Sequence, residues 1–139
     1  MPKMIFVNLP VTDLGSSMTF YKSLGFENNP RFSDDTAACM VWSETINVML
    51  HTHAKWRVFT NRPIPPVTSS EVMLAVSCDS RGAVDAMCQA AAARGGTADV
   101  NPVQDHGFMY GRSLADLDGH VWEAVWMDPA ALATDDPKS

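Results

Sequence analysis

The sequence lacks long hydrophobic runs, basic stretches and any excess of positive charge. Its longest apolar stretches, such as residues 4–7, are far shorter than the roughly 20 residues that cross a bilayer, and too short for the core of a secretory signal. The net charge of -6 disfavours nucleic acid and anionic membranes as partners, because their phosphates would be repelled. These absences predict a cytoplasmic protein with no nucleic-acid or membrane partner.

Paired cysteine motifs are also missing. Cys39, Cys78 and Cys88 are an odd number and show no C-x-x-C spacing, which excludes the usual patterns of a disulfide framework or a thiolate zinc site. Each lies among apolar residues, and nothing nearby in the sequence would lower a thiol pKa. We interpret all three as structural thiols in a reducing compartment.

The pattern that is present is a strand, a helix and three strands, found twice. In the first half we expect strands at 5–11, 27–32, 37–43 and 46–52, and a helix between Asp13 and Gly25. In the second half we expect strands at 71–78, 97–103, 109–115 and 120–127, and a helix from an Asp79 N-cap to a Gly95-Gly96 stop. The repeated order predicts an α+β fold of two βαβββ modules.

A proline-rich linker separates the two halves. Pro63, Pro65 and Pro66 exclude a continuous helix or central strand there, although residues 55–60 fit a helical turn. The predicted organisation is a first module at 1–53, a linker at 54–70, a second module at 71–128 and a fraying tail at 129–139.

Two motifs carry the functional information. The closing motif, residues 116–123, reads DLDGHVWE: its Asp118-Gly119 pair predicts a tight hairpin, and Glu123 follows inside an apolar strand. A carboxylate in such a place must be paired, protonated or bound to metal. The opening motif, residues 9–21, reads LPVTDLGSSMTFY and is followed by Leu24-Gly25-Phe26.

Together these motifs resemble the vicinal oxygen chelate superfamily, which includes glyoxalase I, extradiol dioxygenases, fosfomycin-resistance enzymes and bleomycin-resistance proteins. The opening is similar to the family's V-x-D-L-x-x-S-x-x-F-Y…L-G-F pattern and the ending to its D-x-D-G-x-x-x-E pattern. The resemblance implies that each module curls into an incomplete barrel, that the modules enclose a cavity able to hold a divalent metal, and that the protein is a homodimer.

The family's metal ligands come from four strands, and the resemblance maps them onto Phe6, Met49, Met73 and Glu123. Phenylalanine and methionine supply neither the imidazole nor the carboxylate donors that zinc, nickel or iron(II) sites use. The residues on either side are no better, and Glu71 is the one nearby residue of suitable chemistry. We therefore expect no cofactor, with a divalent metal at Glu123 as the alternative.

His51 and Glu123 form the predicted catalytic pair, because an imidazole beside a desolvated carboxylate suits proton transfer. A His51-x-His53 metal site is a further alternative. The predicted ligand-binding residues are apolar or orienting groups, namely Phe6, Trp42, Met49, Met73, Phe108, Tyr110 and Arg112.

This set predicts the binding of a small apolar or aromatic organic molecule in the barrel cavity, as in the bleomycin-resistance branch that the chain resembles. The alternative is a lyase, isomerase or oxidoreductase of the glyoxalase or dioxygenase type, with Glu123 as general base or metal ligand. The sequence does not decide whether the protein is an enzyme.

Overall fold

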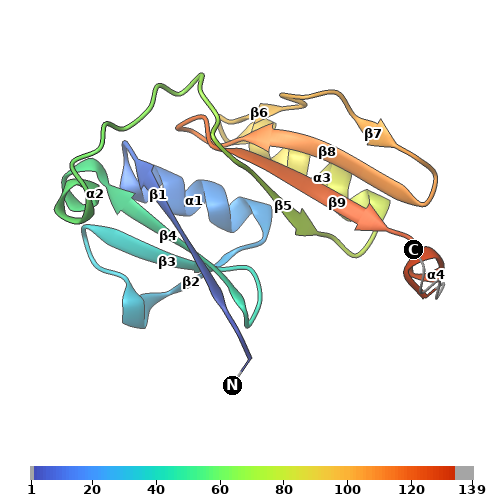
Figure 1. The fold of residues 1–139 in the computed structure, drawn as a ribbon, viewed down its shortest axis with the longest axis horizontal. Coiled ribbons are helices and arrows are strands. Elements are labelled where there is room, and N and C mark those ends of the chain that lie inside the picture. Colours follow the sequence, from blue (N-terminus) through green and yellow to red (C-terminus); the bar gives the residue numbers. More distant parts are fainter. Residues whose placement is uncertain (1, 134–139) are drawn as a thin grey trace.

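The chain folds into two modules joined by a linker: the first is βαβββ, as predicted, and the second adds one more short strand to that order (Figure 1). The computed structural model describes residues 2–133 of the 139. The first module contains β1 (Ile5–Val11), α1 (Leu14–Leu24), β2 (Glu27–Asn29), the 3-10 turn η1 (Pro30–Phe32), β3 (Ala37–Val41) and β4 (Ile46–Thr52). After α2 (His53–Phe59) and the linker, the second contains β5 (Met73–Ser77), α3 (Arg81–Ala93), β6 (Thr97–Ala98), β7 (Gln104–Asp105), β8 (Met109–Ala115) and β9 (Val121–Met127), with α4 (Pro129–Ala133) after it.

Each module has its own mixed sheet. The first has the order β1-β4-β3-β2, and the second has β5-β9-β8-β6 with β7 also paired to β8. The first strand of each module is parallel to the last, and within residues 2–133 it pairs along one side only. The two sheets are not closed into a barrel, so β1 and β5 are free edges.

Both long helices lie behind the sheets in the view of Figure 1, and they pack against each other. Side chains alternate along a strand, so each sheet has one face toward its helix and one face away from it. The helix-facing residues form one core that is shared by both modules and includes Tyr21, Leu50, Val84 and Trp122. We call the two faces turned away from α1 and α3 the first and second outer faces.

Most predicted boundaries hold, and local chemistry explains the exceptions. Asp13 caps α1 as expected, and Gly25 ends it with a positive φ of 115°. The N-cap of α3 is Ser80 and not Asp79, because the Ser80 hydroxyl accepts from the backbone N–H of Ala83. The strand predicted at 97–103 ends at Ala98, where Asp99 turns the backbone with a φ of 57°.

The ends of two other predicted elements also differ. Residues 30–32 form a 3-10 turn and not the end of a strand, because Pro30 starts a tight helical turn capped by Asn29. Part of the tail that was predicted to fray, residues 129–133, is the short helix α4, while 134–139 lie outside the described residues. Among the described helices, none has the length and apolar content needed to cross a membrane.

Candidate functional site

Glu123 lies on the second outer face, between two neighbours of the same sheet. The register of β9 places it opposite Ala75 of β5 and Ser113 of β8. Its carboxylate is half-buried and has no hydrogen-bond or ion-pair partner among residues 2–133. The cavity that it lines measures only about 50 Å³, which leaves room for a water or two and not for an organic molecule.

The four positions of the family's metal site do not meet within one chain. Phe6 and Met49 lie on the first outer face, and Met73 and Glu123 lie on the second. Phe6 is 54 % exposed and Met73 is 55 % exposed. In the described part of the chain, no three His, Cys, Asp or Glu side chains are grouped closely enough to hold a metal ion.

The donors at these positions do not fit the family's metal. A hard divalent cation needs several oxygen or imidazole ligands, whereas this set supplies one carboxylate, two thioethers and a phenyl ring. The amide of Asn101 donates to the Met73 sulfur at 3.2 Å, so that thioether already has a partner. The residues present match an apolar surface with one acid better than a metal centre.

His51 is the most buried polar group of the first outer face. Its Nε2 atom lies 2.8 Å from the side-chain oxygen of Asn8, and the Phe59 ring packs edge-on at 5.2 Å between centroids. Burial lowers the pKa of His51, and the nearby Lys55 charge lowers it further, which favours the neutral ring. Its Nδ1 atom has no hydrogen-bond partner, and the same holds for the amide nitrogen of Asn47 on this face.

The predicted pairing of His51 with Glu123 is not formed within the chain. The two side chains belong to different sheets, and they share no cavity. His53 is the first residue of α2, and His51 is already bonded to Asn8, so the His51-x-His53 metal site is not assembled either.

Tyr110 and Arg112, which the sequence predicts as ligand-binding residues, do not lie on the face that carries Glu123. They lie opposite Trp126 and Ala124 in the register of β8 with β9, on the side that α3 covers. Arg112 bonds Asp85 of α3 at 2.9 Å and Asp99 at 2.8 Å, and the Tyr110 hydroxyl donates to Asp85. These bonds to Arg112 lower the pKa of Asp99, and Tyr110 and Arg112 together lower that of Asp85.

Two predicted aromatic residues also lie away from Glu123. Trp42 packs on Phe26, with ring centroids 4.9 Å apart, and lines a cleft of about 550 Å³ between the modules. Phe108 is half exposed at the turn before β8, next to His106. Of the predicted ligand-binding residues, Phe6, Met49 and Met73 therefore remain on the outer faces.

The cysteines are free thiols, with Cys39 and Cys88 buried and Cys78 partly buried. Burial raises the pKa of all three, that of Cys88 to about 11. Thiols in this state are poor nucleophiles at neutral pH, which agrees with a structural role.

The structure reveals a contact that the sequence analysis missed, because the opening and closing motifs meet in space. Asp118 accepts hydrogen bonds from the backbone N–H and the hydroxyl of Thr12, and the His120 ring lies 2.7 Å from the carbonyl oxygen of Pro10. The Tyr21 hydroxyl donates to the buried Asp116. We call these contacts the motif lock. The sequence carries a sign of these contacts, because the opening motif contains hydroxyl groups and the closing motif contains carboxylates that can accept hydrogen bonds from them.

Comparisons with known proteins agree with this architecture. Residues 3–43 match the family model described as bleomycin resistance protein-like N-terminal. A hypothetical protein from S. aureus is 26% identical, with a TM-score of 0.76 over 91% of this chain and 95% of that one. No curated protein matches the chain.

Two further solved structures share the fold at lower identity. A glyoxalase/bleomycin resistance protein/dioxygenase family enzyme from Burkholderia phytofirmans PsJN is 16% identical, with a TM-score of 0.74 over 91% of this chain and 99% of that one. The fosfomycin resistance protein FosX from Mesorhizobium loti is 12% identical, with a TM-score of 0.66 over 96% of this chain and 99% of that one.

Proposed function

The chain has the fold of the vicinal oxygen chelate superfamily, as its two motifs predicted, and from this premise we propose that it binds a small apolar or aromatic organic molecule without a complete metal site. The proposed site lies between the first outer face of one copy and the second outer face of another. The protein acts in this proposal as a cytosolic homodimer.

The observation that carries the proposal is the chemistry of the four family positions. Phe6, Met49 and Met73 offer a ring and two flexible thioethers, which adapt well to apolar ligands. Glu123 adds one carboxylate with no partner in the described chain, which suits a cationic or hydrogen-bond-donating aromatic molecule.

The exposure of these residues supports a second copy as part of the site. One large apolar side chain on each outer face is exposed, Phe6 of β1 and Met73 of β5. Exposed apolar side chains at such positions are suited to an interaction surface. A dimer that joins the two outer faces would enclose Glu123 in a larger space than its present cavity of about 50 Å³.

Metal analysis followed by ligand screening tests the proposal. Protein purified without chelator should carry less than stoichiometric zinc, nickel, iron or manganese by mass spectrometry. A thermal-shift screen of neutral and cationic aromatic compounds should give hits that weaken in Glu123→Gln. The matched control is Glu44→Gln, which changes an exposed acid in the turn between β3 and β4. A stoichiometric metal that Glu123→Gln removes, or hits that bind the variant unchanged, would contradict it.

A second candidate is a glyoxalase- or dioxygenase-type enzyme with Glu123 as general base. It is favoured by the unpartnered carboxylate of Glu123 and by the free Nδ1 of a neutral His51, since both groups are available to accept a proton. Turnover of a ligand found in the screen, lost in both Glu123→Gln and His51→Gln, would select this candidate over simple binding.

A further inference from the structure

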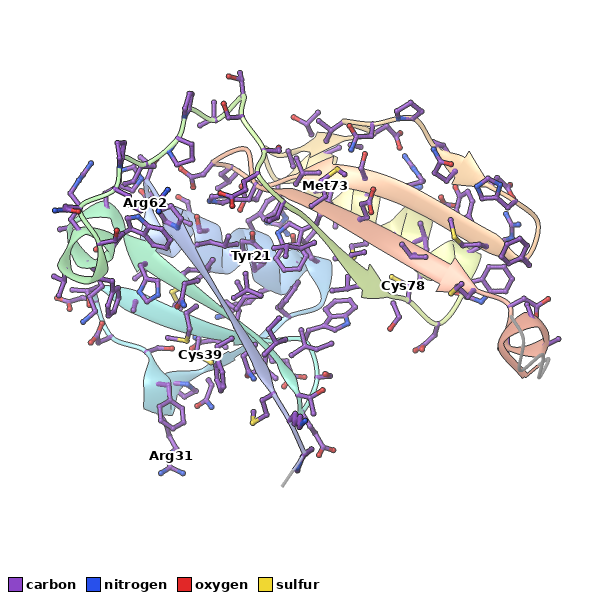
Figure 2. The ribbon with its side chains drawn as sticks, in the orientation of Figure 1. Tyr21, Arg31, Cys39, Arg62, Met73 and Cys78 are labelled. Carbon is purple, nitrogen blue, oxygen red and sulfur yellow. The ribbon has the colours of Figure 1, made fainter. Side chains whose placement is uncertain are left out.

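A second candidate site lies where the ends of the two outer faces meet the linker. A cavity of about 280 Å³ lies under the linker where the two modules join, and we call it the junction cavity. Its lining combines apolar and polar groups, among them Asn8, Pro10, Trp56, Arg62, Glu71 and Val121. Figure 2 labels Arg62, which lies at the start of the linker, close to α2. Glu123 does not line it.

Two prolines and one close backbone contact restrain the linker wall of the junction cavity. Pro63 and Pro65 stiffen the linker segment that lines it. The linker also lies directly on the closing motif, where a Cβ atom at Gly119 would collide with the carbonyl oxygen of Val67. A preformed cavity binds small molecules without a large ordering cost.

The amide of Asn8 is held in one orientation. Its side-chain oxygen accepts from His51 Nε2, and the neutral His51 ring is clamped between the sheet and α2. An amide oxygen only accepts, so this bond leaves the NH₂ group of Asn8 as a donor with no partner in the described chain. Because Asn8 lines the cavity, that donor is available to a ligand.

Two opposite charges complete the lining. The Arg62 guanidinium and the Glu71 carboxylate are exposed, both line the junction cavity, and neither has an ion-pair partner among residues 2–133. Trp56 adds an aromatic wall. The volume lies just below the roughly 300–1,000 Å³ of sites for drug-sized molecules, which points to a ligand of amino-acid size.

We propose that the junction cavity binds a small zwitterion of the amino-acid type. Its carboxylate meets Arg62 and the Asn8 amide, its ammonium group meets Glu71, and its apolar part packs on Trp56. An Arg–carboxylate contact is a strong, charge-assisted hydrogen bond, and the opposite charge at Glu71 excludes simple carboxylates.

An NMR titration of the full chain tests this proposal. L-phenylalanine and L-leucine are the zwitterionic probes, and 3-phenylpropanoate and 2-phenylethylamine each lack one charge. We expect saturable shifts of the Trp56 indole N–H and the Asn8 side-chain amide with at least one amino acid. We expect 3-phenylpropanoate, which lacks the ammonium group, and 2-phenylethylamine, which lacks the carboxylate, each to bind at least about tenfold more weakly than the amino acid.

Matched variants identify the charges involved. Arg62→Gln and Glu71→Gln should each weaken amino-acid binding by about tenfold. Arg57→Gln should not, because Arg57 lines the neighbouring cavity of about 320 Å³ and not the junction cavity. Glu44→Gln is the control for Glu71. No saturable shift with either amino acid, or wild-type affinity retained in Arg62→Gln or in Glu71→Gln, overturns the proposal. None of these results depends on metal content or on aromatic binding at Glu123.

Discussion

Tyr21 donates a hydrogen bond of 2.5 Å to Asp116, and its hydroxyl also accepts from the Trp122 indole N–H at 2.9 Å. Tyr21 lies on α1 and Asp116 in the closing motif, so this bond joins the two modules inside their common core. The carboxylate of Asp116 also accepts from the backbone N–H groups of Asp118 and His120.

Tyr21→Phe should lower the free energy of unfolding by about 2 kcal/mol, because it leaves the buried Trp122 N–H without its acceptor and Asp116 without one donor. Urea denaturation measures the change. Tyr110→Phe is the control. The Tyr110 hydroxyl makes a hydrogen bond to Asp85, which is less buried than the Tyr21 bond, so its loss should cost less than about 1 kcal/mol. Equal stabilities of the two variants would show that the Tyr21 bond does not hold the modules together.

The titration of Asp116 should reflect its burial. Burial raises the pKa of this carboxyl, while the His120 charge and the Tyr21 hydroxyl lower it. The folded chain therefore holds this proton at a pH where the unfolded chain has released it. The stability that Asp116 contributes is complete below its unfolded pKa and is lost as pH rises through its folded pKa.

Carbon-13 NMR of the carboxyl groups checks this directly. The Asp116 midpoint should lie above the ordinary aspartate range and should rise further in Tyr21→Phe, because a donor to the carboxylate is lost. Asp105 serves as an internal reference: its hydrogen bonds with Arg81 lower its pKa to about 2, and the variant should not move it. An Asp116 midpoint that does not respond to Tyr21→Phe would contradict the assignment.

Phe6→Asp should convert the proposed dimer into a monomer, because the charge would be buried without a partner against the second copy. Phe6 is 54 % exposed in the single chain, so the substitution should leave the fold intact. Sedimentation velocity measures the mass. Val58→Asp is the control, since Val58 is 74 % exposed on α2 and lies outside both outer faces. A wild-type monomer, or a dimer that survives Phe6→Asp, would argue against the proposed site between two copies.

Gly119→Ala should destabilise the chain more than Gly107→Ala does. Both glycines have positive φ, 84° and 80°, so the backbone strain of alanine is alike at the two positions. Only at Gly119 does the new Cβ meet backbone, that of Val67, whereas Gly107 has open space around it. We expect an excess cost of about 1–3 kcal/mol in thermal or urea unfolding, with faster proteolysis of the linker. Equal costs would mean that the linker does not press on the closing motif.

The fold was predictable because its signals are local. Asp13, Gly25 and the Asp118-Gly119 turn mark where a helix starts, where it ends and where the last hairpin turns, and each depends on its own neighbours. The linker was predictable in the same way, because its prolines exclude a helix or a central strand at their own positions.

The orientation of Tyr110 and Arg112 was not predictable with the same rules. Alternation fixes that these two residues share a face of β8, but the face itself depends on the register with β9. The turn at 116–120 sets this register so that Ser113, and not Arg112, lies opposite Glu123, and a shift of one residue would reverse every side chain. The junction cavity could not be predicted from the sequence either, because its walls come from the linker and both modules, whose relative positions no local pattern gives.

The motif lock has a consequence for how this chain can be divided. Thr12 and Tyr21 lie before the linker, and their partners Asp116 and Asp118 lie after it, so the lock uses no residue of the linker. A break in the peptide chain between α2 and β5 would leave these bonds and the shared core complete. Two fragments that are made separately and meet at the proline-rich segment would therefore contain between them every residue of the motif lock. We expect them to associate through these bonds and the shared core.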